Sequence, residues 1–505
     1  MNFTVTGLTV ETKGMTPEQL EQAKIFSGKN AGICYMGDSY FDSAVSDPTK
    51  ALPRFIGTAK NAHHSISDHI RIEVLMEGIS KMVAIVLNSL QDYATSEKSG
   101  RYTIMTGNSE RECELYDKWC KIYQDAILKE EPDIDDAWLQ SMLDKKYPDN
   151  GYKVVNCKRM EVEPKLCVTD DRESFNWFYN DLMSNNNRPS RKKAQENARY
   201  VLSVFTRSTT MGYSTSLRQW NYIYDWCQKY LSQFMPRYDK EYVDAMTNNG
   251  GKVTIVYKGT DTPVTYFEEQ LYYDMLKLSN FIFENLYVEE LRDTKNRYFE
   301  FLVNGSGEKD HPMRYYNISA FEPDGYTNTF DYTESTHSED DIIDTMYQVA
   351  YPASFVHIAQ AERHRTLQYF MYFNPCSKVF DWFIPPIIRG TEYESQWIED
   401  LESVKDIIPQ ATQVMIVETG HISKFILKCE ERLCSKAQWE IMNQTKLTAK
   451  RFLDKYANDD CSAVFKAYAS KLESNTTEVA TKCQLQGHCA EGCKGGTKCA
   501  LNRKM

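Results

Sequence analysis

The sequence of 505 residues contains no apolar run long enough to cross a membrane. A bilayer span needs about 20 consecutive apolar residues, whereas the densest apolar stretch here, residues 82–87, has the length of a core segment. The N-terminal sequence MNFTVTGLTVETKG also lacks the basic region and the apolar block of a signal peptide. We therefore expect a cytoplasmic protein with no membrane segment.

Positive charge is scarce as well, because 71 acidic residues outnumber 59 basic ones and leave a net charge of −12. A surface that binds the phosphates of a nucleic acid needs a basic face. The charge balance therefore argues against a nucleic-acid partner. It leaves room for a local group of arginines that binds one small phosphorylated molecule.

The 14 cysteines are scattered, and none lies in a motif that activates a thiol as a nucleophile. This is typical of reduced intracellular thiols rather than of a disulfide scaffold. The C-terminal tail is different, since it groups Cys483, Cys489, Cys493 and Cys499. Four thiolates bind zinc well, but the C-x5-C-x3-C-x5-C spacing is wider than that of zinc ribbons. A zinc site and a metal-free tail both stay open.

What the chain does contain is an order of elements that occurs twice. Residues 70–76 alternate like a half-buried strand that Gly78 ends, and Ser80 is placed to cap the next helix. Residues 345–350 predict a similar strand, with Pro352 in the first turn of the following helix. A second strand and helix follow in each half, at 196–226 and at 404–441. The repetition predicts a tandem duplication.

Two polar motifs occupy the same context in the two halves. The first half contains Glu97-x-Ser99-x-Arg101, and the second contains Arg363-His364-Arg365. Together they resemble the signature R-H-R-x-x-S-x-N-E-x-S-x-R of the flavin-dependent thymidylate synthases. In isolation, the first motif is an ordinary solvated loop and the second a helix end with favourable cations. Each half keeps what the other has lost, which favours a functional role for both.

The resemblance continues on both sides of the signature. Residues 63–69, with His63 and Ser65, are similar to a histidine-containing stretch before the family's strand, and residues 198–202, with Arg199, to its A-R-x-x-L-P strand start. Residues 432–441, which begin at Arg432, resemble the family's last active-site helix. The first half has Trp226 where that arginine belongs, although it keeps Asn221 at a polar position of the helix.

The resemblance implies a role for each of these residues. Those that would bind the substrate dUMP are Glu97, Ser99, Arg101, Arg199 and Gln360. Arginine forks and hydroxyls suit its dianionic phosphate. Those that would bind the flavin are Arg363, His364, Arg365, His63, Ser65 and Asn221. Arg432 is the catalytic candidate, since it would stabilise negative charge on the uracil ring as carbon 5 becomes nucleophilic.

The reaction that the resemblance implies is transfer of a one-carbon unit from methylenetetrahydrofolate to carbon 5 of dUMP. Electrons would pass from NADPH through FAD, and the product would be dTMP. Departures from the family at Ala94, Ser96 and Trp226 leave open a pyrimidine nucleotide hydroxymethylase acting on dUMP or dCMP. A non-catalytic protein that binds nucleotide or flavin is the other alternative.

The predicted fold is α+β, with two divergent repeats of the family fold, in which helices pack on an antiparallel sheet, and a Cys-rich tail. Residues 1–250 form the first repeat, 251–478 the second, and 479–505 the tail. Residues 252–310 match neither repeat, and read as a hairpin-like start followed by a long helix around 269–291. Because one chain holds one complete signature, we expect a homodimer with one FAD per chain. The site can form within one chain or between two.

Overall fold

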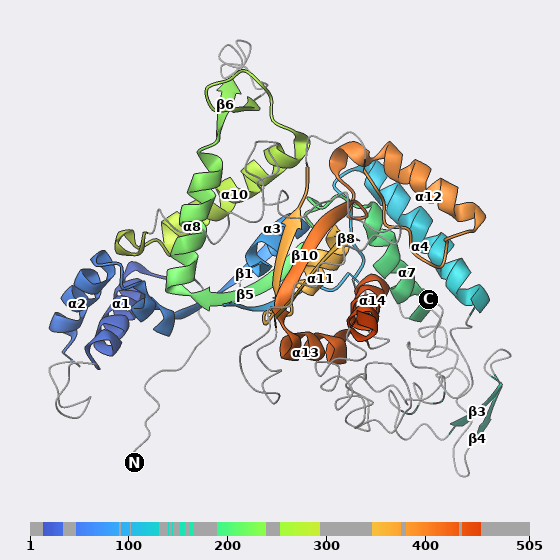
Figure 1. The fold of residues 1–505 in the computed structure, drawn as a ribbon, viewed down its shortest axis with the longest axis horizontal. Coiled ribbons are helices and arrows are strands. Elements are labelled where there is room, and N and C mark those ends of the chain that lie inside the picture. The colour runs from blue at the N-terminus through green and yellow to red at the C-terminus, as the bar shows by residue number, and fades with distance from the viewer. Residues whose placement is uncertain are drawn as a thin grey trace.

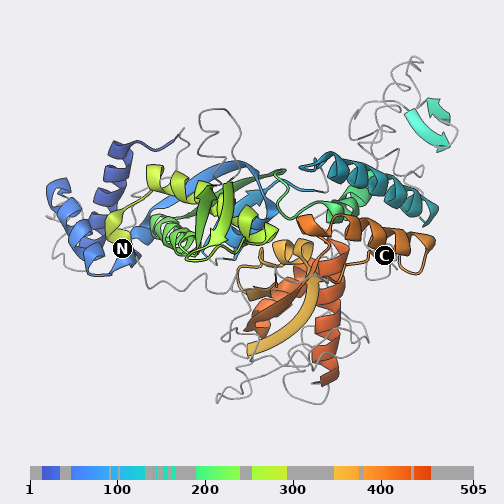
Figure 2. The same ribbon diagram turned by 90° about the horizontal axis from the view of Figure 1, so that it is seen from above.

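The computed structural model describes residues 14–33, 47–89, 92–100, 103–130, 140, 144, 152–156, 161–164, 189–238, 253–292, 346–374, 380–433 and 437–455. Within these ranges, helices pack around two three-stranded antiparallel sheets, and two strand pairs stand apart from them. Figures 1 and 2 show the molecule from two directions. The expected α+β class is confirmed at this level.

The first sheet has the spatial order β1 (Arg71–Ile79), β5 (Thr209–Ser216) and β2 (Ala94–Glu97). Helix α3 (Lys81–Asn88) connects β1 to β2, and all of its residues are buried. Ser80 caps this helix, because its Oγ accepts the Val83 N–H at 3.1 Å. Strand β5 runs directly into α8 (Leu217–Leu231), which Ser216 caps in the same way.

The second sheet has the spatial order β8 (Met346–Ser354), β10 (Gln413–His421) and β9 (Gln368–Tyr372). Helix α11 (Phe355–Ala361) connects β8 to β9, and Ser354 caps it by accepting the His357 N–H. Strand β10 runs into α13 (Ile422–Arg432). The two sheets therefore share one order of elements along the chain, and in each the last strand lies in the centre.

The observed bounds differ from the expected ones. Gly78 does not end β1, because its φ of +62° accommodates a bulge and the strand continues to Ile79. Pro352 lies in β8 opposite Met415, not in a helix, and it is tolerated because β8 is an edge strand. The strands expected from 196 and 404 begin only at Thr209 and Gln413.

Both strands begin later than expected because a short 3-10 turn lies in the segment before each of them. These turns are η4 (Arg199–Val201) and η9 (Lys405–Ile407). The loops after them meet in an antiparallel bridge between Ser203 and Pro409, which ties the halves together. The single helix expected over 421–441 is two helices, α13 and α14 (Trp439–Lys455).

Residues 253–292 pack on the first half. Strand β7 (Val253–Tyr257) pairs with β6 (Phe234–Tyr238). It also turns back on the residues that follow it, as the sequence predicted, through an antiparallel bridge between Val256 and Pro263. Helix α10 (Tyr266–Asn285) lies along α8 and is followed by η5 (Glu289–Leu291). Its Phe267 also reaches Phe373 of the second half, with ring centroids 4.9 Å apart. This helix thus contributes to a core that includes residues of both sheets.

The remaining elements surround this centre. They are α1 (Pro17–Gly32), α2 (Pro48–Lys60), η2 (His64–His69), α4 (Glu110–Glu130), β3 (Tyr152–Asn156), β4 (Glu161–Pro164), α7 (Pro189–Ala198) and α12 (Glu392–Ser403). Helices α4 and α12 pack through Trp119 and Trp397, whose rings meet edge to face at 4.6 Å. Helices α1 and α2 lie at the opposite end of the molecule from α4 and α12 (Figures 1 and 2).

In the described part of the chain, no helix combines the length and the apolar character needed to span a membrane. The predicted boundary at residue 250 and the predicted tail, with Cys483, Cys489, Cys493 and Cys499, lie outside the described residues.

Candidate functional site

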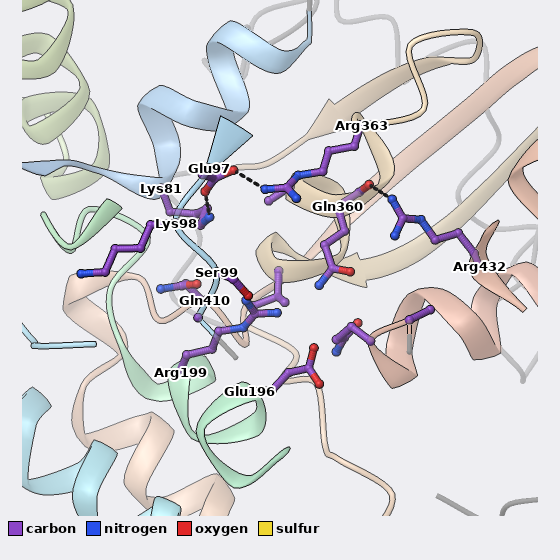
Figure 3. A pocket seen from close by; sticks show the side chains of 15 residues that line it. Lys81, Glu97, Lys98, Ser99, Glu196, Arg199, Gln360, Arg363, Gln410 and Arg432 are labelled. Carbon is purple, nitrogen blue, oxygen red and sulfur yellow. Dashed lines mark hydrogen bonds and ion pairs between the residues drawn. The ribbon is translucent and has the colours of Figure 1, made fainter. Parts of the chain in front are cut away.

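A pocket of about 180 Å³ lies between the two halves of the chain. Its first-half walls come from α3, the residues after β2, α7 and η4, and its second-half walls from α11, α13 and the loops beside them (Figure 3). The lining residues are Lys81, Glu97, Lys98, Ser99, Gly100, Glu196, Arg199, Val356, Ala359, Gln360, Arg363, Gln410, Arg432, Ala437 and Gln438. Contributions from distant sequence positions thus converge on one cavity.

The lining is positively charged although the chain as a whole carries −12. Lysine and arginine contribute five of the lining side chains, and glutamate contributes two. One of these glutamates, Glu97, is already paired with two of the cations. Concave sites lined by one sign of charge raise the local concentration of the opposite ion. The pocket is therefore suited to an anion.

Glu97 joins the two halves at the pocket wall. Its carboxylate accepts from Lys81 Nζ through Oε1 and from Arg363 Nη2, at 3.0 Å, through Oε2 (Figure 3). The Glu97 side chain is 1% exposed and that of Lys81 is 11% exposed. Burial by itself would raise the pKa of Glu97, but Lys81 and Arg363 outweigh it and hold the pKa below its usual value. The remnants of the split signature therefore touch through an ionised carboxylate.

Arg199 is a buried cation of the pocket that forms no ion pair among the described residues. It is 8% exposed, and its Nε and Nη2 have no hydrogen-bond partner in the described residues. A buried charge is costly unless it is paired and hydrogen-bonded. An anion in the pocket would supply the missing acceptors for these donors.

Gly100 sets the position of Arg199. A Cβ at residue 100 would lie 3.0 Å from Met105 Sδ and 3.2 Å from both Cδ and Nη1 of Arg199. The lack of a side chain at this position therefore lets the guanidinium approach the turn after Ser99.

This contact gives a prediction for Gly100→Ala. The new methyl group should displace Arg199 and weaken anion binding several-fold, with at most a small change in thermal stability. Gly57→Ala is the matched control, because a Cβ there meets nothing within 4 Å and the residue lies inside α2. Titration of both variants with dUMP, followed by calorimetry, checks this. Equal affinity in the two variants would contradict the role of Gly100.

Arg432 enters the pocket from the end of α13. Its Nε donates to His364 Nε2 at 2.6 Å. Its Nη2 donates to the Gln360 carbonyl at 3.4 Å, the contact drawn in Figure 3. Burial, with help from Arg432 and Lys428, lowers the pKa of His364 to about 2. His364 is therefore a neutral acceptor over the whole physiological range.

Arg365 lies beside this pocket without lining it, and it contacts the first half. Its Nη1 donates to the Tyr93 carbonyl, and its guanidinium lies 5.6 Å from the centre of the Tyr93 ring. Tyr93 in turn donates its hydroxyl to the Glu362 carbonyl at 2.8 Å. Arg363 and Arg365 thus both fasten the end of α11 to the first half, while each keeps an exposed side chain.

The structure gathers part of the predicted site. The predicted residues that line the pocket are Glu97, Ser99, Arg199, Gln360, Arg363 and Arg432. His364 and Arg365 lie beside the pocket without lining it. Arg101 lies outside the described residues.

Three predicted flavin contacts lie elsewhere. His63, which precedes η2, and Ser65, which lies within it, are both exposed, and η2 packs against α1 and α8 rather than against the pocket. Asn221 is 1% exposed, and its amide bonds to the backbone of Leu217, Leu286 and Val288. With those groups satisfied, Asn221 holds α8 to the segment after α10. Its predicted contact with a cofactor has no support in this arrangement.

Lys81 is the main pocket residue that the sequence did not reveal. It stands at the first position of α3, whose other residues are nearly all apolar and buried. A lysine within an otherwise buried helix was the available signal, since lysine is almost never buried without a partner. Gln410 and Gln438 carried no such signal. Among the described residues, no group of His, Cys, Asp or Glu side chains is placed to bind a metal ion.

Taken together, the α+β fold carries a cationic pocket between its two halves whose lining is suited to a small anion. The family model described as thymidylate synthase complementing protein matches residues 28–229. Residues 28–229, which include the first sheet and Arg199, are therefore similar to that family. The comparison with curated proteins gave no match.

Proposed function

We propose that the pocket binds the phosphate end of a pyrimidine nucleotide for a thymidylate synthase reaction. The observation that carries this proposal is Arg199, a buried guanidinium that lines a cationic cavity and whose Nε and Nη2 have no acceptor among the described residues. A dianionic phosphate supplies several acceptors to arginine donors at once. The family match over residues 28–229 supports a thymidylate synthase-type enzyme.

The size of the pocket fits the smaller part of such a ligand. Pockets for drug-sized molecules measure roughly 300–1,000 Å³, and this one measures about 180 Å³. Phosphate and sugar would occupy the cavity between Ser99, Arg199 and Gln360. The base would extend toward Arg432, which stabilises negative charge on the carbonyl oxygens of the ring.

Flavin binding is the second part of the proposal, and the residues fit it only partly. Arg363 and Arg365 have exposed guanidinium groups beside the pocket, each with donors beyond those used by Glu97 or the Tyr93 carbonyl. They would hold the anionic part of FAD. His364 fits poorly, because Arg432 occupies its Nε2. When bound, the flavin supplies the reducing electrons, with NADPH and methylenetetrahydrofolate as co-substrates.

The chain's own residues then have distinct tasks. Lys81 and Arg363 keep Glu97 ionised, so this carboxylate stays fixed between the halves and does not compete as a proton donor. Arg199 neutralises the phosphate, and the Gln360 amide orients the ligand. Placing the reacting groups in a fixed geometry is a large part of what such a protein supplies.

We also propose that the two sheets arose by tandem duplication with one site kept. In matching positions after the serine caps, α3 begins with Lys81 and α11 with Phe355. By strand register, Glu97 opposite Met211 corresponds to Met371 opposite Ile416. The charged pair of one half is thus apolar in the other, which supports one nucleotide and one FAD per chain. A homodimer remains the expected assembly.

The proposed function predicts that the purified protein, incubated with FAD, binds dUMP much more tightly than deoxyuridine. Loss of the phosphate should cost at least about 1.5–3 kcal/mol, because charged hydrogen bonds are lost. Calorimetry with the two ligands measures this, and the absorbance spectrum reports bound flavin. Equal affinities would remove the phosphate site from the proposal.

Product analysis then separates the enzymatic alternatives. With methylenetetrahydrofolate and NADPH, conversion of dUMP to dTMP supports the synthase. A hydroxymethyl product from dUMP or dCMP supports the related hydroxymethylase. Tight dUMP and flavin binding with no flavin reoxidation in the presence of folate and dUMP would identify a binding protein.

A further inference from the structure

A hydrogen bond between His364 and Arg432 joins the residues after α11 to the end of α13 at the pocket wall. The Nε–Nε2 distance of 2.6 Å requires that His364 Nε2 carries a lone pair, since the arginine Nε can only donate. The imidazole proton therefore resides on Nδ1. This tautomer follows from the geometry, because a protonated ring or the other tautomer would place two N–H donors face to face.

The surroundings keep His364 in this state. Burial, then Arg432 and Lys428, lowers its pKa to about 2. Lys428 is itself fixed, because its Nζ donates to Glu418 Oε2 at 2.6 Å and both side chains are 1% exposed. The cation near His364 therefore does not swing away. His364 remains an acceptor and cannot become a competing cation beside Arg432.

These contacts decide which donors Arg432 can offer. Its guanidinium has five N–H bonds. Nε is used by His364, and Nη2 by the Gln360 carbonyl. Arg432 lines the pocket, whereas His364 does not. The remaining donors, above all those of Nη1, are left for a ligand, with the plane of the guanidinium fixed by two anchors.

We propose that His364 is a positioning residue that orients Arg432 toward the base of a bound pyrimidine nucleotide, and is not a flavin contact. This inference rests on the proposed function, since it concerns the same pocket. It reassigns the central residue of Arg363-His364-Arg365, which the sequence placed with the cofactor. His364 acts only through Arg432, so the two residues should behave as one unit.

Three variants test the proposal on flavin-saturated protein. His364→Gln places an amide oxygen near the position of Nε2 and keeps the acceptor, whereas His364→Leu removes it. His69→Leu is the control for loss of an exposed histidine at the end of η2. Calorimetry with dUMP measures nucleotide affinity, and absorbance measures flavin occupancy.

The expected result is a loss of dUMP affinity of about tenfold or more for His364→Leu, the scale of one hydrogen bond to a charged group. His364→Gln and His69→Leu should bind dUMP as the unmodified protein does, and all three should retain flavin. In an Arg432→Ala background, His364→Leu should have no further effect on dUMP affinity, because coupled residues are not additive. If the Leu variant does not fold, His364→Asn, whose side chain is too short for the contact, replaces it.

Other outcomes would overturn the inference in recognisable ways. Loss of flavin from His364→Gln with dUMP affinity intact would restore His364 to the cofactor. Unchanged dUMP affinity in His364→Leu, or additive effects with Arg432→Ala, would show that His364 does not act through Arg432. If the unmodified protein does not bind dUMP at all, the proposed function itself is refuted. That outcome can be told apart from the two above, because in both of them the unmodified protein binds dUMP.

Discussion

Arg199→Ala should abolish most of the affinity of the pocket for dUMP while leaving the ligand-free protein at least as stable as before. Truncation of one partner of a buried, hydrogen-bonded charge pair costs about 2–5 kcal/mol of binding free energy. That corresponds to roughly a 30-fold to several-thousandfold rise in Kd. Calorimetric titration with dUMP measures the loss.

The effect on stability has the opposite sign because Arg199 has unsatisfied donors in the ligand-free state. Removing a buried guanidinium whose Nε and Nη2 have no acceptor among the described residues relieves part of its desolvation penalty, which offsets the lost packing. Arg237→Ala is the control, since this arginine forms an exposed pair with Asp261. Unaltered dUMP affinity together with a lower melting temperature would show that Arg199 is structural and would sink the anion site.

Glu97→Ala should be among the most destabilising changes in the chain. It leaves Lys81 buried without its carboxylate and Arg363 without its ion pair. Breaking a buried pair from one side costs about 3–5 kcal/mol. Urea unfolding at neutral pH measures the change in the free energy of unfolding.

The matched control is Asp92→Ala, which removes an exposed pair with Arg71 whose side chains are 42% and 52% exposed. Such a pair contributes about 0–1 kcal/mol. The double variant Lys81→Met/Glu97→Leu should recover much of the loss, because it removes the unpaired charge. A single variant no more harmful than Asp92→Ala would mean that the pair is not formed in solution.

The same pair gives a pH dependence with a defined sign. Since the folded protein holds the pKa of Glu97 below its usual value, the unfolded chain takes up this proton first. The stabilisation is therefore full above the ordinary glutamate pKa of about 4.3. It is lost as the pH falls through the lowered folded value. The difference in stability between Glu97→Ala and the unmodified protein should accordingly be smaller at pH 3 than at pH 7.

Local patterns predicted much of this fold. The alternation in residues 70–76 and the cap Ser80 mark elements whose formation depends on neighbouring residues. Pro352 was wrongly predicted to begin a helix. An edge strand tolerates a proline, and the sequence does not show which strand lies at the edge of the sheet. The start of β5 was misjudged because the 3-10 turn at Arg199 resembles the start of a strand.

The site was predicted where a residue's chemistry was distinctive and missed where only packing defines it. Arg199, Arg363 and Arg432 are conspicuous as cations within matching motifs, and all three line the pocket. Asn221 shows the limit, because a polar residue on an amphipathic helix looks the same whether it faces a ligand or a buried backbone. The partners of His364 and Lys81 are distant in sequence, so no local pattern contains them.

Helix α10 packs on aromatic residues of the second half. Its Phe267 contacts Phe373, which itself packs on Phe355 with ring centroids 5.4 Å apart. These aromatic rings occupy the part of the second half that corresponds to the charged residues around Lys81. Residues 253–292, which matched neither repeat in sequence, thus complete a core between the two sheets.

Because both walls of the pocket belong to one covalent chain, their meeting is an intramolecular event. The effective concentration of one wall around the other is set by the connecting segments and not by the amount of protein. A pocket shared by separate subunits comes apart on dilution, and it requires both surfaces in matched quantity. Here one chain supplies both walls in equal number, and a ligand bound between them would have an affinity that does not depend on protein concentration. Each half therefore needs to supply only one wall of the pocket, so the residues of the two walls can differ.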